Sequence, residues 1–333
     1  MRISLPADEA GRQRLEALTS GRAFVKLEPW TIWRVTGADR ATFFHNFCTA
    51  ELKKRASGEG CEGFVLTSQG RILDFVFFTP LGETLWIDGY GDRHEVWNSH
   101  FDRYRFTEKV VWHNVGSDTL CLYVSDAAAF DALGIGPDDE GARAYSSRLA
   151  TFGDAELVVR RVDWLGRVGW TLFVPLRHAD AIIDRLASNG FEEATLTEWH
   201  RLRALHLTPL VGHDLSEKNL PQEAGRDAMA ISYTKGCYLG QETVARLDMM
   251  GHVNWKLSLI EGPVPAGDPP PELTVAGKPV ARFGTIIERC GSASALAFIR
   301  RERAQAGAEL ATDAGTFVVK RVAGSADSGS PAS

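Results

Sequence analysis

Short runs of apolar and β-branched residues, separated by turn residues, recur along most of the chain. They predict strands at 31–35, 65–67, 72–78, 84–87, 120–124, 156–162 and 169–174. Trp97, Phe101 and Tyr104 repeat at helical spacing and predict one buried face of a helix. Further helices are expected over 41–47, 126–133, 179–187 and from residue 196 onward. Interspersed strands and helices indicate an α+β protein.

Two of these helices are preceded by the spacing of a capping box. In such a box, a Thr hydroxyl and an acidic side chain three residues later satisfy free amides of the first turn. Thr36 and Asp39 predict the start of the helix over 41–47. Thr195 and Glu198 predict the start of the helix from 196.

The pattern of apolar and turn residues changes after Gly251. Residues 253–322 contain short strand-like runs separated by Pro and Gly turns, which predict a small antiparallel β-barrel over 251–322. Residues 25–250 are expected to form the main α+β region, in two subdomains. Residues 1–24 are interpreted as a polar lead-in, and the Ser/Gly/Ala/Pro-rich residues 323–333 as a disordered tail.

The charge balance narrows the classes of ligand. The 333 residues carry a formal net charge of −6, whereas nonspecific nucleic-acid binding needs a basic surplus. We therefore expect no direct binding of nucleic acid. No stretch has the roughly 18 successive apolar residues of a membrane span, and residues 1–8 do not resemble a signal peptide. The sequence thus predicts a cytoplasmic protein without a membrane partner.

Five cysteines are scattered along the chain: Cys48, Cys61, Cys121, Cys237 and Cys290. None forms a C-x-x-C pair, so neither a zinc ribbon nor a thioredoxin-type pair is expected, and reduced cytosolic thiols fit best. Cys48 and Cys121 fall in apolar patterns that predict burial. Cys61 and Cys290 lie beside glycines in expected turns and are predicted to be more accessible.

The segment 235–246, Lys-Gly-Cys-Tyr-Leu-Gly-Gln-Glu-Thr-Val-Ala-Arg, holds the strongest signal for chemistry. Its glycines permit the backbone conformations of a shaped ligand loop, and a helix is expected to begin near Gly240. A cysteine just before a helix start favours the thiolate, and Lys235 and Arg246 would lower the pKa of Cys237 further if they lie near it. The alternative is a buried, inert cysteine. The residues alone leave both interpretations open.

This segment resembles the K-G-C-[FY]-x-G-Q-E-x-x-A-R signature of the YgfZ family, which is related to the folate-dependent aminomethyltransferase of the glycine cleavage system. Three other stretches are similar to family motifs: 35–44 with Thr49, 66–74 and 219–223. The resemblance covers roughly residues 25–250, and the C-terminal barrel also fits. It implies an aminomethyltransferase-like ring of domains around a central folate site.

Departures from the aminomethyltransferase pattern concern the reacting groups. Those enzymes typically have Asp where this chain has Cys237, and two acidic residues where it has Asp74 and Phe75. Their pterin-holding Glu is replaced by Leu205, which cannot accept the N–H donors of a pterin. We therefore expect aminomethyl transfer to be absent or trivial.

The resemblance, together with the groups that bind a folate, predicts a set of site residues. A pterin needs an apolar slot with a few polar groups, and the glutamate tail needs Arg or Lys. Cys237 and Asp74 are predicted to carry the chemistry. For the glutamate tail, the predicted contacts are Arg71, Lys235 and Arg246. For the pterin edge, they are Gln222, Glu223 and Asp74. The segment 235–246, here called the cysteine loop, is predicted to contribute Tyr238, Gln241 and Glu242 as well. Tyr238 is also explained as a core aromatic that positions the loop.

No metal site is expected. His200, His206, His213 and His252 with Asp214 match no recurring ligand spacing. The dense tryptophans are better explained by core packing than by a stacking platform for nucleic acid.

Three functions remain open at this point. The resemblance implies a tetrahydrofolate-binding accessory factor in the assembly or repair of iron–sulfur proteins, with iron–sulfur proteins or cluster carriers as partners. Cys237 would then act as a soft ligand for iron or as a nucleophile. The second function is a folate-dependent one-carbon transferase or demethylase in which Asp74 orients or activates the folate amine. The third is a non-enzymatic interaction module with a vestigial folate pocket.

Overall fold

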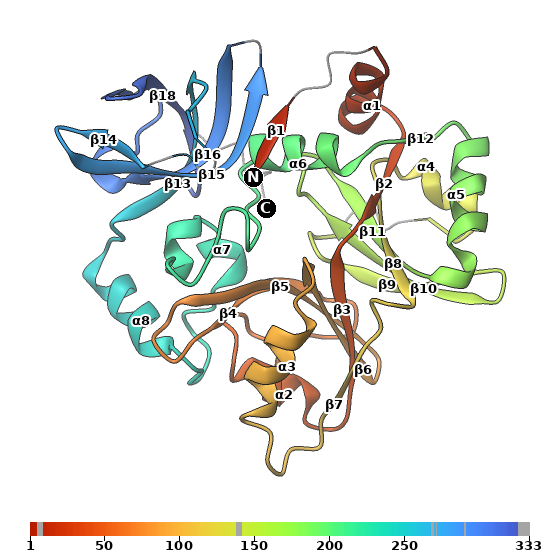
Figure 1. Ribbon diagram of the computed structural model, residues 1–333. Helices are drawn as coiled ribbons and strands as arrows, with labels where there is room; N and C mark the ends of the chain where they lie inside the picture. The colour runs from red at the N-terminus through yellow and green to blue at the C-terminus, as the bar shows by residue number, and fades with distance from the viewer. Residues whose placement is uncertain (5–8, 138–141, 268–269, 271, 290, 326–333) are drawn as a thin grey trace.

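The computed structural model describes residues 1–4, 9–137, 142–267, 270, 272–289 and 291–325. These residues form three β-sheets, with helices on the sheets and between them (Figure 1). Strands gather into sheets and helices pack against them, as expected of an α+β protein. Within this part of the chain, no helix is long and apolar enough to cross a bilayer.

The β3 sheet is built from antiparallel strands in the order β4-β5-β6-β3-β7. Its helices bury Phe43, Phe44, Trp97 and Phe101 in one core with Trp33. The bounds are β3 (Trp30–Thr36), α2 (Arg40–His45), β4 (Cys61–Leu66), β5 (Ile72–Leu81), β6 (Thr84–Tyr90), α3 (His94–Asp102) and β7 (Val111–Asn114).

The β8 sheet has the order β12-β2-β8-β11-β10-β9 and is antiparallel except where β12 joins β2. Helices α4 and α5 cover one of its faces, burying Phe130, Ile182 and Leu186. The bounds are β2 (Ala23–Leu27), β8 (Thr119–Val124), α4 (Ala128–Leu133), β9 (Ser147–Phe152), β10 (Ala155–Val162), β11 (Gly169–Pro175), α5 (Ala179–Ser188) and β12 (Glu192–Glu193).

The β15 sheet has the order β1-β15-β16-β13-β18-β17, with β14 paired to β15. Its bounds are β1 (Arg2–Ser4), β13 (Trp255–Pro263), β14 (Leu273–Val275), β15 (Lys278–Arg289), β16 (Ser292–Arg300), β17 (Glu309–Thr312) and β18 (Gly315–Val322). Within the described residues, the outer strands β1 and β17 do not pair with each other. The predicted small antiparallel β-barrel is therefore not confirmed.

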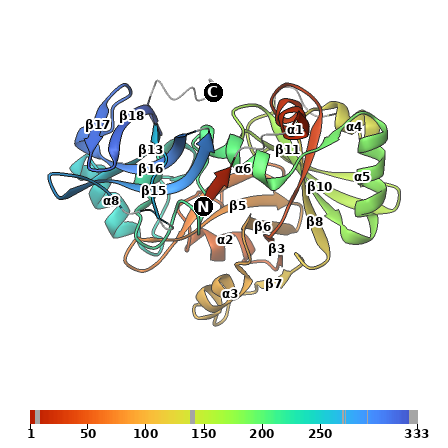
Figure 2. The same ribbon diagram turned by 45° about the horizontal axis from the view of Figure 1, so that its top comes forward.

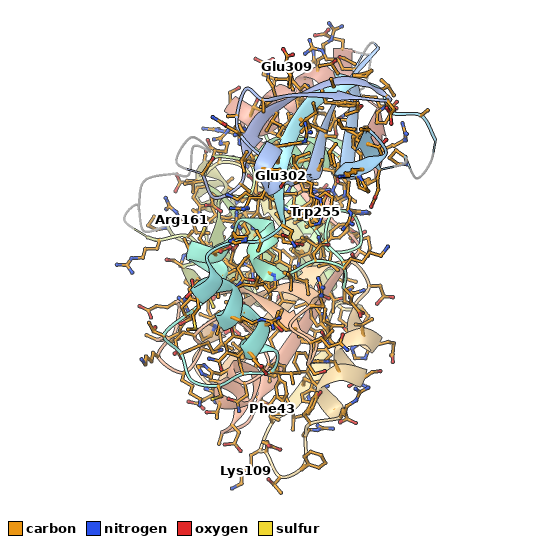
Figure 3. The ribbon with its side chains drawn as sticks, turned by 90° about the vertical axis from the view of Figure 1, so that its left-hand side faces the viewer. Phe43, Lys109, Arg161, Trp255, Glu302 and Glu309 are labelled. Carbon is orange, nitrogen blue, oxygen red and sulfur yellow. The ribbon has the colours of Figure 1, made fainter. Side chains whose placement is uncertain are left out.

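Helices α1 (Glu9–Ser20) and α6 (Leu196–Leu205) lie between the β15 sheet and the β8 sheet (Figure 2). The predicted capping box of α6 is confirmed, because Thr195 accepts from the amide of Thr197 and Glu198 accepts from the amide of Thr195. Two further helices, α7 (Asp227–Ala230) and α8 (Gln241–Met250), lead into the β15 sheet. Seen from the side, Glu309 and Lys109 lie at opposite ends of the molecule, with Trp255 between them (Figure 3).

One core is shared by all three sheets. Trp30 of β3 lies 5.5 Å from Trp164, and Trp164 lies 4.9 Å from Phe77 of β5, measured between ring centroids. Within this core, Arg160 of β10 donates to the carboxylate of Asp88 on β6 at 2.8 Å, and both side chains are buried. Aromatic side chains thus occupy the junction of the sheets. The implied ring with a ligand site at its centre is not confirmed.

Three expectations about element boundaries are wrong. Residues 1–24 are not a lead-in, because β1 pairs in parallel with β15 and α1 packs on α6. Thr36 does not cap α2, whose N-cap is Asp39. The carboxylate of Asp39 instead accepts from the amide of Lys109 at 2.7 Å. The tail is ordered at its start, since the amide of Ala323 donates to the carbonyl of Leu257 at 2.9 Å. Residues 326–333 lie outside the described part.

Candidate functional site

The cysteine loop is anchored by a buried lysine. Lys235 Nζ donates to the carbonyl oxygens of His45 at 2.6 Å, Cys48 at 2.7 Å and Ala50 at 2.6 Å. Its ammonium also lies 4.8 Å from the ring of Tyr238. Burial lowers the pKa of Lys235. Because three carbonyls take the three ammonium hydrogens, Lys235 has no donor left for a folate tail or for Cys237.

Cys237 is exposed, whereas Cys48, Cys61 and Cys121 are buried. Burial raises the pKa of Cys61 to about 12 and also raises the pKa of Cys48 and of Cys121. The predicted accessibility of Cys61 is wrong, because Cys61 is the first residue of β4 and not part of a turn. Cys290 lies outside the described residues. Among the described cysteines, Cys237 is the thiol that a partner can reach.

The β4–β5 turn packs tightly on the cysteine loop. Gly70 and Gly240 both have positive φ, of +74° and +80°. A Cβ added at Gly70 would lie 2.6 Å from the Cβ of Thr243, and one added at Gly240 would lie 2.7 Å from the carbonyl of Thr67. Thr243 also donates to the carbonyl of Gln69 at 3.0 Å. Only glycine fits at these two contacts without a shift of the neighbouring atoms.

The third predicted segment, 219–223, joins the other two. The amide of Ile72 donates to the carbonyl of Asn219 at 3.1 Å. Gln222 Nε2 donates to the carbonyl of Val244 on α8 at 2.9 Å. Three segments that are far apart in the sequence therefore meet beside α8.

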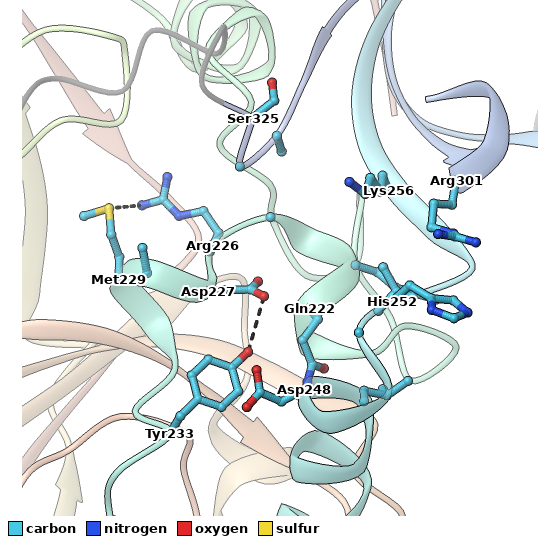
Figure 4. Close-up of a pocket in the computed structure, with 18 residues that line it drawn as sticks. Gln222, Arg226, Asp227, Met229, Tyr233, Asp248, His252, Lys256, Arg301 and Ser325 are labelled. Atoms are coloured by element: carbon cyan, nitrogen blue, oxygen red, sulfur yellow. Dashed lines mark hydrogen bonds between the residues drawn. The ribbon is translucent and has the colours of Figure 1, made fainter. Parts of the chain in front are cut away.

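A cavity of about 740 Å³ lies next to this meeting point (Figure 4). It is bounded by α7, α8, the start of β13 and the end of β18. Its lining comprises Gln222, Glu223, Gly225, Arg226, Asp227, Ala228, Met229, Tyr233, Leu247, Asp248, Gly251, His252, Val253, Lys256, Arg301, Ala323, Gly324 and Ser325. The volume is in the range of pockets that hold drug-sized ligands, roughly 300–1,000 Å³.

Two acceptor atoms in the cavity lining lack a partner. Asp227 Oδ1 and Gln222 Oε1 are buried and have no hydrogen-bond donor among the described residues. The other carboxylate oxygen of Asp227 accepts from the hydroxyl of Tyr233 at 3.3 Å. Burial raises the pKa of Asp227 to about 6, and Asp248 adds to the shift. Buried acceptors without donors are costly, and both side chains belong to the cavity lining.

The predicted site residues divide into two groups. Gln222 and Glu223 line the cavity. The other predicted residues do not: Asp74, Arg71, Lys235, Cys237, Tyr238, Gln241, Glu242 and Arg246. Tyr238 is buried and Gln241 accepts from the amide of Tyr238 at 3.3 Å, so both shape the loop. Arg71 donates to the carbonyl of Lys218 at 2.9 Å, while Glu242 and Arg246 are exposed on α8.

Asp74 lies on the far side of β5 from the shared core, in the cluster under α3. Its carboxylate accepts from Arg93 Nε at 2.7 Å and from Trp97 Nε1 at 2.6 Å. Burial raises the pKa of Asp74, and the Arg93 charge acts in the opposite direction. The neighbouring Phe75 points into the shared core, where its ring lies 4.9 Å from Phe64. The carboxylate of Asp74 is thus engaged in holding α3 against the β3 sheet.

Several lining residues could not be found from the sequence. Asp227, Tyr233, Lys256 and Arg301 stand in no recognised motif, and they come from separate elements. Asp227 follows the 219–223 segment closely in the sequence. That proximity is the one feature of the sequence that could have placed Asp227 among the predicted site residues. Lys256 and Arg301 belong to the C-terminal strands, which carried no chemical expectation.

A family model described as the GCVT N-terminal domain matches residues 13–235, more than half of the 333 residues. The chain belongs to the GCVT N-terminal domain family. A solved relative shares the fold of this GCVT-family chain: the glycine cleavage system aminomethyltransferase T from Bartonella henselae has a TM-score of 0.79 at 14% identity. That match covers 92% of this chain and 87% of the other. The predicted aminomethyltransferase-like fold is confirmed.

Curated relatives place the GCVT-family chain in a YgfZ/GcvT-like group. A chloroplastic protein of Arabidopsis thaliana, named as a transferase, is 25% identical over 81% of this chain and 63% of its own length. The human mitochondrial iron–sulfur cluster assembly factor IBA57 is 27% identical over 80% of this chain and 75% of its own length. Further bacterial relatives carry the name tRNA-modifying protein YgfZ. The chain thus spans less than two thirds of the first of these relatives.

Proposed function

We propose that this protein binds a reduced folate and serves in the assembly or repair of iron–sulfur proteins, with Cys237 as the group that meets the partner. The observation that carries the proposal is the cavity of about 740 Å³ beside the cysteine loop, with two unsatisfied buried acceptors. The human relative's name supports the iron–sulfur role. Direct contact with RNA is not part of the proposal, because the chain carries a net charge of −6.

The acidic end of the cavity fits the pterin. A pterin presents an amino group and a ring N–H on one edge, and a carboxylate is the acceptor that such a pair of donors prefers. Asp227 and Gln222 line the cavity, and each has one buried acceptor atom without a donor among the described residues. Glu223 also lines this cavity, although its Oε2 already accepts from the amide of Leu220 at 3.2 Å.

Cys237 would act outside the folate cavity. It is exposed on the loop between the cavity residue Tyr233 and helix α8, which supplies Asp248 to the lining. A folate that orders Tyr233 and α8 would therefore also order the cysteine loop. The thiolate is a soft ligand for iron, so Cys237 can share an iron atom or a cluster with a partner that supplies the remaining ligands.

The pH dependence of folate binding tests the pterin end. Because the pKa of Asp227 is about 6, the carboxylate is ionised at pH 7.5 and mostly protonated at pH 5. We expect the affinity for tetrahydrofolate to fall about tenfold over that range. Tyr233, Asp248 and Lys256 are the titratable groups that act on this carboxylate. Calorimetry of the intact protein measures the change.

Asp227→Asn should bind the folate roughly ten- to a hundredfold more weakly at pH 7.5 and should lose most of the pH dependence. Asp180→Asn, an exposed change on α5, is the matched control and should bind like the unmodified protein. An unchanged pH profile in Asp227→Asn would remove Asp227 from the pterin site.

The role of the thiol is tested in cells that lack the protein. We expect Cys237→Ser to fail to restore iron–sulfur enzyme activity, because a serine hydroxyl stays protonated and is a poor ligand for iron. Folate affinity in vitro should be unchanged, because Cys237 does not line the cavity. Cys61→Ser, at a buried thiol, is the control for loss of sulfur in general. Full rescue by Cys237→Ser would refute the thiol role.

A further inference from the structure

A second, smaller cavity of about 120 Å³ lies at the β3 sheet and shares no lining residue with the first. It is bounded by the start of α2, by the loop 52–57 between α2 and β4, and by the β5–β6 turn. Its volume is far below the roughly 300–1,000 Å³ of pockets that hold drug-sized ligands. A small ligand, or one group of a larger ligand, therefore fits.

The charged residues in the lining of this cavity are all cationic. They are Arg40, Lys53 and Arg55, and Ser57 adds a hydroxyl. No acidic residue belongs to the lining among the described residues. A hollow lined by one sign of charge concentrates ions of the opposite sign, so this cavity favours an anion.

The acidic side chains of the neighbouring segments do not neutralise these cations. The carboxylate of Glu51 accepts from the amide of Lys53 at 2.8 Å, and that of Glu59 accepts from a backbone amide of the same loop at 3.0 Å. Glu83 pairs with Arg40 at 3.4 Å, but the side chain of Glu83 is 97% exposed, and such surface pairs are weak. The other two cations of the lining have no carboxylate partner in the described part of the chain.

The guanidinium of Arg40 is fixed in place. Its Nη1 donates to the carbonyl of Gly37 at 3.0 Å, and its Nη2 donates to the carbonyl of Gly82 at 2.9 Å. The amide of Gly82 donates to Ser57 Oγ at 2.9 Å, so the hydroxyl and the guanidinium contact the same residue of the lining. A Cβ added at Gly82 would meet nothing within 4 Å. Open space therefore lies beside both groups, and the Ser57 hydroxyl still has its own hydrogen to donate.

Arg55 is fixed in the same way as Arg40. Its Nε donates to the carbonyl of Glu51 at 3.0 Å, and its Nη1 donates to the carbonyl of Gly60 at 3.2 Å. Lys53 is exposed, and its side chain makes no hydrogen bond within the described residues. The cavity thus combines two arginines in fixed positions with one lysine that is free to adjust to a ligand.

We propose that this cavity binds a phosphate group, which Arg40, Lys53 and Arg55 neutralise and to which Ser57 donates a hydrogen bond. Guanidinium groups bind phosphate oxygens in pairs, and a dianion satisfies several cations at once, whereas a carboxylate carries one charge. Lys53, Ser57 and Gly82 are exposed, so the fourth substituent of a phosphate monoester can extend into solvent. The site does not depend on the proposed folate function.

Calorimetry of the intact protein with inorganic phosphate and with glycerol 3-phosphate tests the inference. At low ionic strength and pH 8, where a phosphate monoester is a dianion, we expect saturable binding at one site. Acetate should bind at least about tenfold more weakly. Lys53→Glu should weaken phosphate binding by about tenfold or more, because one charge-assisted hydrogen bond is replaced by repulsion.

Two further variants complete the experiment. Arg40→Gln should also lose about tenfold or more in phosphate affinity, and its thermal unfolding without phosphate shows whether the fold survives. If Arg40→Gln does not fold, Lys53→Glu decides, because its side chain supports no other contact. Lys278→Glu, the same change at an exposed position outside the cavity, is the matched control and should bind phosphate within about twofold of the unmodified protein.

The two probes also distinguish the source of the phosphate. Tighter binding of glycerol 3-phosphate indicates a monoester as the ligand, and tighter binding of inorganic phosphate indicates the free ion. Three results would overturn the inference: phosphate binding by Lys53→Glu equal to that of the unmodified protein, acetate binding as tight as that of phosphate, or no saturation by either probe up to about 10 mM.

Discussion

Lys235→Ala should lower the free energy of unfolding by about 3–5 kcal/mol, as is usual when the partner of a buried charged interaction is removed. The change leaves the carbonyls of His45, Cys48 and Ala50 without their shared donor in a buried site. Each unsatisfied buried acceptor costs about 1–3 kcal/mol, and local relaxation recovers part of that. Urea unfolding followed by circular dichroism measures the loss.

The control is Lys53→Ala, because Lys53 is an exposed lysine close to the same segment. It should change stability by less than about 0.5 kcal/mol. The opposite pattern, with normal stability of Lys235→Ala and a large loss of folate affinity, would show that this lysine holds the folate tail. That was the role the sequence suggested.

Arg203→Ala should destabilise the protein by about 3–5 kcal/mol, because it leaves a buried carboxylate without its counter-charge. Arg203 and Asp214 pair with side chains that are 0% exposed. Arg203 also donates to Thr285 Oγ1 on β15 at 2.6 Å, and Asp214 accepts from the amide of Thr285 at 2.7 Å. This cluster joins α6 to the β15 sheet, so thermal unfolding of the variant should separate into two transitions.

A second variant distinguishes loss of the charge pair from loss of packing. Arg203→Met combined with Asp214→Leu removes both charges and keeps apolar volume, so it should recover a large part of the lost stability. If the double variant is as unstable as Arg203→Ala, the hydrogen bonds to Thr285 and not the charge balance hold the β15 sheet to α6. A single cooperative transition in Arg203→Ala would contradict the role of this cluster at the junction.

A short sequence motif predicts the structure correctly where its hydrogen bonds form between neighbouring residues of the chain. The Thr195 and Glu198 box forms as predicted, because both of its hydrogen bonds stay within one turn. The same spacing at Thr36 and Asp39 does not form a capping box, because the carboxylate of Asp39 accepts a hydrogen bond from the amide of Lys109, which is far away in the sequence. A spacing rule cannot show such a competitor.

The residues of the candidate site also depend on contacts between distant parts of the chain, which the sequence does not show. The sequence located the segments that meet beside α8, since their residue types are specific. It could not show that the side chain of Lys235 turns inward, away from the exposed thiol two residues later. Nor could it bring Lys256 and Arg301 into the same cavity as Asp227, because that arrangement depends on the pairing of β13 with β16 and on the path between α7 and α8.

The pairing of β1 with β15 has a consequence for the order of events during synthesis. Arg2, Ile3 and Ser4 find their partners at Ile286, Ile287 and Glu288. At a translation rate of about 5–20 residues per second, these first residues wait on the order of tens of seconds before their partners leave the ribosome. Until then one edge of the β15 sheet does not exist, and the nascent chain carries an unpaired strand. A chaperone that holds the emerging amino-terminal segment should therefore raise the yield of folded protein more than one added after release.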